Sequence, residues 1–150
     1  MSRVGTKSGW SGNCVETIST ATTLNPSDSG KVFLCTFTLT DSSSGAQIIT
    51  TPLASQELAG FNCKFILSEA QAGDDAEEDI EIGNATDNMV AFITDPGSTA
   101  EKATMLYNAT ASYIHFDHTG AAGDVIELIC DGTQWYAYGM TGVDGGILTS

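Results

Sequence analysis

Apolar and polar residues alternate along several segments of this chain. In the segments Lys31–Thr40 and Phe61–Ser68, every second residue is a phenylalanine, a cysteine or a leucine. A period of two places these residues on one face of a β-strand and the residues between them on the other. Intervening polar residues such as Asn62 and Lys64 indicate that one face is buried and the other faces water.

A β-hairpin is predicted near the end of the chain. β-Branched and apolar residues fill Val125–Cys130, three aromatic residues lie in Gln134–Tyr138, and Asp131-Gly132 separates the two runs. Asp-Gly is favoured at the centre of a type I′ turn, because both central residues need positive φ. We therefore expect a type I′ turn centred on Asp131-Gly132. The residues of the first strand expected to face the core are Ile126, Leu128 and Cys130.

The remaining segments extend this pattern into an all-β protein. We count about eight to ten short strands separated by turn residues, no convincing long helix, and one helical turn over Leu53–Ala59. Strands at this spacing are typical of sandwiches, jelly rolls and small barrels. We predict an antiparallel β-sandwich or jelly-roll-like domain over residues 14–150, with an N-terminal arm over residues 1–13.

The arm contains Arg3, Lys7 and Trp10 in a sequence rich in glycine and serine. Such a terminus is commonly poorly ordered. Arginine and tryptophan also dominate the energetics of protein interfaces, so the arm is equally a candidate for docking on an acidic or concave partner. Both interpretations stay open, and these three residues are the candidate docking residues.

Charge narrows the classes of function. Of the 150 residues, 16% are charged, and nineteen acidic residues oppose five basic ones, for a net charge of −14. No basic patch is available to attract nucleic-acid phosphates or an anionic membrane, so we expect neither partner. The negative charge either keeps the protein soluble or marks the exterior of a large assembly, where it keeps particles apart.

The four cysteines show no CxxC spacing. Three of them, Cys35, Cys63 and Cys130, lie in apolar predicted strands, so we interpret them as small buried hydrophobic residues. The sequence starts without a secretory signal, and no apolar run approaches the ~20 residues of a membrane span. These features predict folding in a reducing cytoplasm.

The segment His115–His118 is the most metal-like cluster in the sequence. On a strand, His115 and Asp117 would share a face and His118 would point away. Two ligands on one face are too few for a closed zinc site, so we predict a surface-facing pair and no bound metal or cofactor. The acidic run Glu69–Asp79 does not match an EF-hand loop and is interpreted as a solvated loop. Without a Gly-x-Ser-x-Gly elbow or a phosphate-binding glycine motif, we expect no enzymatic activity.

Three aromatic residues near the C-terminus, Trp135, Tyr136 and Tyr138, allow two interpretations. One is a packed tryptophan with two amphipathic tyrosines on a strand. The other is a platform on which a sugar ring stacks against Tyr136 and Tyr138.

Several segments, in their order, resemble a small β-rich domain that recurs in virion proteins of tailed bacteriophages, namely capsid decoration proteins, head fibres and tail-fibre modules. The segments that carry the resemblance are Thr23–Lys31, Ile48–Pro52, Ala59–Leu67, Asp79–Ile82 and Ala122–Tyr136. They extend over most of the chain. The resemblance implies a non-enzymatic virion protein, commonly a homotrimer, that lies on a shell or fibre.

A chain of this length with an N-terminal arm and no stalk is more similar to a capsid decoration protein than to a fibre tip. The expectation is a cement protein made in the host cytoplasm and placed on the outer surface of a phage head. There it would bind the major capsid protein and stabilise contacts between capsid subunits, with the acidic surface outward. The alternative is a receptor- or carbohydrate-binding module of a phage fibre.

Overall fold

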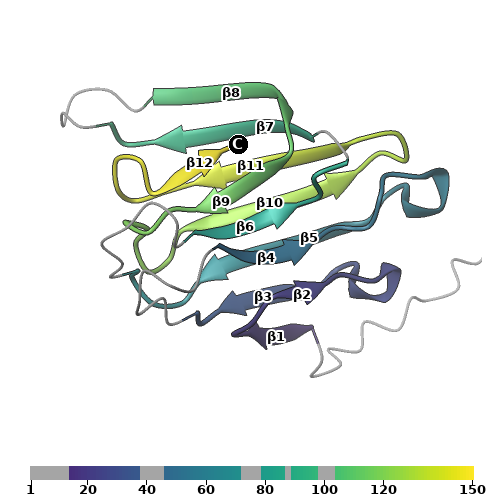
Figure 1. Ribbon diagram of the computed structural model, residues 1–150, viewed down its shortest axis with the longest axis horizontal. Helices are drawn as coiled ribbons and strands as arrows, with labels where there is room; N and C mark the ends of the chain where they lie inside the picture. The colour runs from purple at the N-terminus through teal and green to yellow at the C-terminus, as the bar shows by residue number, and fades with distance from the viewer. Residues whose placement is uncertain (1–13, 38–45, 72–78, 87–88, 98–103) are drawn as a thin grey trace, which may run out of the picture.

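The computed structural model describes residues 14–37, 46–71, 79–86, 89–97 and 104–150. Their backbone forms strands and two short 3-10 helices, with no α-helix among these residues. The strands make two sheets (Figure 1). Their inward side chains build one hydrophobic core. The all-β, sandwich-like domain is therefore confirmed. The candidate docking residues Arg3, Lys7 and Trp10 lie outside the described residues.

The larger sheet has seven strands and the smaller sheet has five. The larger sheet runs in the order β1 (Val15–Ile18), β3 (Val32–Cys35), β5 (Asn62–Leu67), β10 (Val125–Cys130), β11 (Trp135–Met140), β7 (Met89–Asp95) and β8 (Thr104–Ala111). The smaller sheet runs in the order β12 (Ile147–Thr149), β9 (Tyr113–Phe116), β6 (Ile80–Gly83), β4 (Gln47–Thr50) and β2 (Thr22–Thr23). The 3-10 helices are η1 (Pro26–Asp28) and η2 (Gln56–Leu58), and η2 lies within the predicted helical turn.

The first six strands alternate between the two sheets. β1, β3 and β5 are neighbours in the larger sheet, β2, β4 and β6 are neighbours in the smaller one, and each runs parallel to the next. Because consecutive strands lie in different sheets, the chain makes a full circuit before it re-enters a sheet in the same direction. The pairing is mixed rather than antiparallel throughout, which corrects the predicted pairing within the sandwich.

From β7 onward, antiparallel pairs prevail. β7 pairs with β8, β10 with β11, and β9 with both β6 and β12, all antiparallel. The β10–β11 hairpin joins the two halves of the larger sheet, since β10 also pairs with β5 and β11 pairs in parallel with β7. This hairpin lies in the interior of the sheet (Figure 1).

The core is built around aromatic rings. Phe33 and Phe65 stack with ring centroids 5.2 Å apart, and Phe61 meets Trp135 edge-on at 5.3 Å. Trp135 is fully buried, and its indole N–H donates to the Pro52 carbonyl at 3.0 Å. The inward positions predicted from alternation that fall among the described residues are all buried: Phe33, Cys35, Phe37, Phe61, Cys63, Phe65, Leu67, Ile126, Leu128 and Cys130.

The β10–β11 turn differs from the predicted type I′ turn. Asp131 donates its backbone N–H to the Gln134 carbonyl at 3.2 Å, so the turn is centred on Gly132-Thr133, one residue later than expected. Within the turn, only Gly132 has positive φ, +96°. Elsewhere among the described residues, positive φ occurs only at glycines. Asp131 instead closes the turn through its side chain, which accepts hydrogen bonds from Thr133 and Gln134.

Candidate functional site

The outward side of the larger sheet carries a patch of exposed apolar side chains. On β7 and β11, alternate residues fill the core, so the residues between them are directed away from it. β8 lies at the edge of the sheet beside β7, and among its described side chains only Ala111 is buried. The register places Phe92 of β7 between Tyr138 of β11 and Tyr107 of β8. We define the outer patch as Phe92, Met105, Tyr107, Tyr138 and Met140.

The aromatic rings of the outer patch contact one another. Phe92 stacks on Tyr138 with centroids 5.6 Å apart, and it lies 5.0 Å from the ring of Tyr107. Met105, Met140 and Tyr107 are 73%, 64% and 62% exposed. A hollow of about 300 Å³ opens beside the rings, between Met105 and Met140. Grouped exposed apolar side chains of this kind mark sites of contact with proteins or ligands.

The strands around the outer patch carry little outward charge. Among the described residues of β5, β7, β8, β10 and β11, only Lys64 and Glu127 bring a charge to this side, and they form an ion pair with each other. The whole chain has a net charge of −14. Another acidic molecule therefore meets little repulsion over these strands.

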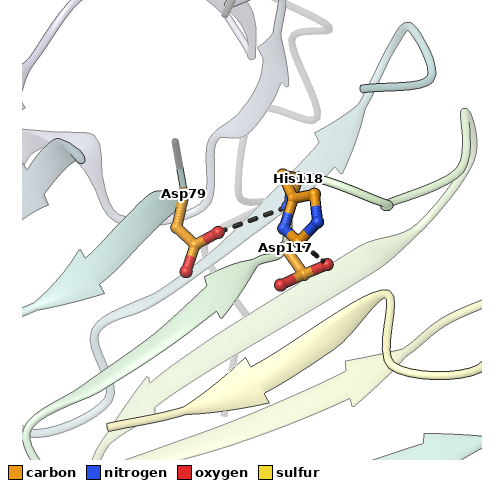
Figure 2. Close-up of side chains that lie close together, drawn as sticks. All are labelled: Asp79, Asp117 and His118. Carbon is orange, nitrogen blue, oxygen red and sulfur yellow. Dashed lines mark hydrogen bonds and ion pairs between the residues drawn. The ribbon is translucent and has the colours of Figure 1, made fainter. Parts of the chain in front are cut away.

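A second group of functional side chains lies where β6 begins and β9 ends. The two strands are antiparallel with Ile80 opposite Phe116, and the same register brings Asp79 opposite Asp117. Asp79, Asp117 and His118 each offer a carboxylate oxygen or an imidazole nitrogen, and these atoms all lie within 4.8 Å of one another (Figure 2). We call these three residues the polar cluster.

The turn after β9 overturns the expectation that His118 points away. The strand ends at Phe116, and Asp117 Oδ2 accepts hydrogen bonds from the backbone N–H and hydroxyl of Thr119, at 2.9 and 2.6 Å. This turn places His118 Nδ1 3.2 Å from Asp117 Oδ2 (Figure 2). The backbone N–H of His118 donates to Asp79 Oδ1 at 3.2 Å.

His115 lies beside the polar cluster. His115 and Asp117 are each 6% exposed, so the prediction of a surface-facing pair is wrong: both are buried. His115 Nε2 lies 3.3 Å from Asp79 Oδ2. Burial lowers the pKa of His115, and burial together with the charge of Asp117 raises the pKa of Asp79 to about 6. Both shifts arise because charge is removed from water.

Asp79 is the member of the cluster that sequence reasoning missed. It belongs to the acidic run Glu69–Asp79, which we expected to be a solvated loop, yet Asp79 is 9% exposed. Residues 72–78 of that run lie outside the described residues. His118 is 39 positions away along the chain, so only the register of β6 with β9 identifies the pair.

Comparison with known proteins adds no relative. No protein-family model, no curated protein and no solved structure matches the chain. Among the described residues, no helix is both long and apolar enough to cross a membrane. The outer patch and the polar cluster are the two candidate functional sites of the described residues.

Proposed function

We propose that this chain is a non-enzymatic structural protein of a phage virion, a decoration or cement protein on the outer surface of the head. In this role it binds the major capsid protein, associates with its own copies as a homotrimer, and stabilises contacts between capsid subunits. The observation that carries the proposal is the outer patch, an exposed aromatic and methionine surface on an otherwise acidic protein. The resemblance to virion modules supplies the setting.

Burial of the outer patch against a neighbouring copy is the proposed source of assembly energy. Apolar area removed from water contributes ~25 cal/mol per Å², and each aromatic pair adds ~0.5–1.5 kcal/mol. Two acidic copies meet with little repulsion over strands whose outward charge is limited to the Lys64–Glu127 pair. The acidic remainder then faces solvent and keeps virions apart.

The N-terminal arm is the proposed contact with the major capsid protein. Arg3 and Lys7 offer cations to an acidic groove, and Trp10 offers a large apolar anchor. The arm and the outer patch thus have separate tasks, attachment to the shell and contact between copies. Attachment to the shell and contact between copies can therefore be tested by separate variants.

Reconstitution on purified phage heads that lack the protein tests both tasks. The wild-type chain should co-sediment with the heads and raise the temperature at which they release DNA. The double variant Tyr138→Glu, Met140→Glu buries two charges at the contact and should weaken occupancy by about tenfold or more. Deletion of residues 1–12 should remove head binding altogether.

A control variant separates loss of the patch from a general increase in acidity. Leu148, 37% exposed, lies on β12 in the other sheet, and Leu148→Glu adds a carboxylate there. This variant should coat heads as the wild type does. Normal coating by both the patch variant and the arm deletion would show that the proposal is wrong.

The aromatic rings of the outer patch also favour a second candidate, a receptor- or carbohydrate-binding module of a phage fibre. Sugar rings stack on exposed aromatic faces, and Tyr107 and Tyr138 present such faces. Tyr136 is less available, because its hydroxyl is hydrogen-bonded to Gln134 and Asp131. Saturable glycan binding that disappears in Tyr138→Ala, with no binding to heads, would favour this candidate.

A further inference from the structure

The polar cluster holds more negative charge than its surroundings balance. Asp79 directly precedes β6 and Asp117 directly follows β9, so the pairing of these strands brings the two carboxylates close together, where like charges repel. They are 9% and 6% exposed, so water screens them little. Lys31 and Lys64, the basic residues of the described part of the chain, pair with other acids.

Two other buried carboxylates show how this protein balances such a charge with its own backbone. Asp124, 2% exposed, accepts a backbone N–H on each of its oxygens, and so does Asp95 at 4%. Asp117 differs, because donors from the described residues reach only its Oδ2. Asp79 accepts one backbone N–H, on Oδ1. The cluster therefore keeps carboxylate oxygens available to a further ligand.

One imidazole nitrogen of each histidine beside these carboxylates lacks a hydrogen bond. His118 Nδ1 and His115 Nδ1 are buried, and neither makes a hydrogen bond to the described residues, although His118 Nδ1 lies 3.2 Å from Asp117 Oδ2. The His115 side chain is 7% exposed and directs Nε2 at Asp79 Oδ2, 3.3 Å away. Buried polar atoms without a partner are uncommon, and a bound ion is one explanation for them.

We propose that Asp79, Asp117 and His118 bind a divalent transition-metal ion, and that His115 orients the Asp79 carboxylate. Imidazole suits zinc, iron and nickel, while carboxylates suit manganese, so the mixed set selects a first-row metal. Ligand atoms within 4.8 Å of one another need only small movements to surround an ion at ~2.0–2.2 Å. Water completes the coordination.

The ion would join the start of β6 to the end of β9, a structural role within the smaller sheet (Figure 2). The outer patch lies on the larger sheet, so this inference does not depend on the proposed virion function. Zn²⁺ is the probe, because it is bound tightly by carboxylate and imidazole ligands and has no redox chemistry.

Zinc binding by the full-length, untagged chain tests the proposal. A Cys14→Ser background excludes zinc capture by that exposed cysteine. After treatment with a chelator, calorimetric titration with Zn²⁺ in excess Mg²⁺ should show one saturable site per chain, and zinc should raise Tm. Co²⁺ in place of Zn²⁺ should give the visible absorption of a bound ion without a thiolate band.

Asp79→Asn and His118→Gln preserve side-chain size while they weaken the ligand set, and each should lower zinc affinity by about tenfold or more. The matched control Glu57→Gln removes an exposed acid on η2, outside the cluster, and should leave the affinity unchanged. Absence of a saturable zinc site in the Cys14→Ser protein overturns the proposal, and so does equal weakening by the control. If a cluster variant does not fold, the Co²⁺ spectrum of the Cys14→Ser protein decides.

Discussion

At the scale of single residues, the Asp131 side chain stabilises the β10–β11 turn, which therefore does not need positive φ at both central residues. Its Oδ1 accepts hydrogen bonds from the Thr133 N–H and hydroxyl, each at 2.7 Å, and from the Gln134 N–H at 2.9 Å. These bonds, with that from the Thr133 hydroxyl the largest contribution, lower the pKa of Asp131 to about 2. Positive φ is then needed only at Gly132.

The low pKa of Asp131 predicts a pH-dependent contribution to stability. Because its folded pKa lies below the unfolded value of ~3.9, the contribution is complete above that value and is lost as pH falls toward about 2. Asp131→Asn keeps an acceptor but removes the charge, so it should destabilise the protein at neutral pH. Urea unfolding across a pH series should show the difference from wild type shrinking below about pH 4.

The control for this series is Asp144→Asn, which removes an exposed carboxylate elsewhere. It changes the net charge equally without touching the β10–β11 turn. A difference between wild type and Asp131→Asn that stays constant down to about pH 3 would contradict the assigned role of the carboxylate.

At the scale of elements, the corner between β8 and β9 decides how the chain changes sheets. β8 belongs to the larger sheet and β9 to the smaller one, with Ser112 between them. Gly83 of β6 lies against this corner, paired with Tyr113. A Cβ added at Gly83 would collide with the Ser112 carbonyl oxygen and lie 3.0 Å from Tyr113 Cα. Glycine is therefore required by close backbone packing.

Gly83→Ala should lower the free energy of unfolding by ~1–3 kcal/mol, because the corner must move away from β6 to accept a methyl group. Urea denaturation followed by tryptophan fluorescence measures this loss. Gly142→Ala is the matched control: its Cβ would find only Asp124 Oδ1, at 3.8 Å. That variant should stay within ~0.5 kcal/mol of wild type, and equal losses in both would refute the packing argument.

Alternation predicts the strands but not their partners. The period of two in Asn62–Leu67 and Val125–Cys130 identifies both the strands and their buried faces, and the structure confirms them. The same period carries no information on which strand lies next to which. The parallel neighbours β3 and β5 arise because β4 lies between them in sequence but in the other sheet.

The sequence predicts only part of the outer patch, and it misplaces one residue of the polar cluster. Tyr138 is flagged by alternation in a clear strand, but Met105 and Tyr107 belong to a segment, Thr99–Tyr107, whose pattern fits a short helix or a strand. His118 was placed wrongly because the strand ends at Phe116 and the chain turns. Long-range register and the ends of strands are tertiary properties, and a local pattern does not contain them.

At the scale of the whole molecule, labelling of three buried cysteines can show whether the larger sheet unfolds in one step. Cys35 on β3, Cys63 on β5 and Cys130 on β10 are on adjacent strands, and all three are at most 4% exposed. Burial raises the pKa of Cys35 and Cys63 to about 12. A thiol in this state is protonated and inaccessible, so it reacts with a thiol reagent only after the sheet opens.

A single hydrophobic core links these strands to the smaller sheet, so we expect the three thiols to lose protection together. In a Cys14→Ser background, the extent of labelling by a thiol reagent in short pulses should follow urea concentration with one midpoint. That midpoint should coincide with the loss of native fluorescence of buried Trp135. Early labelling of Cys35 alone would instead show that β1 and β3, at the parallel edge of the sheet, open as a separate unit. The two outermost strands of the parallel circuit would then unfold before the rest of the larger sheet, in which β5 stays paired with the β10–β11 hairpin.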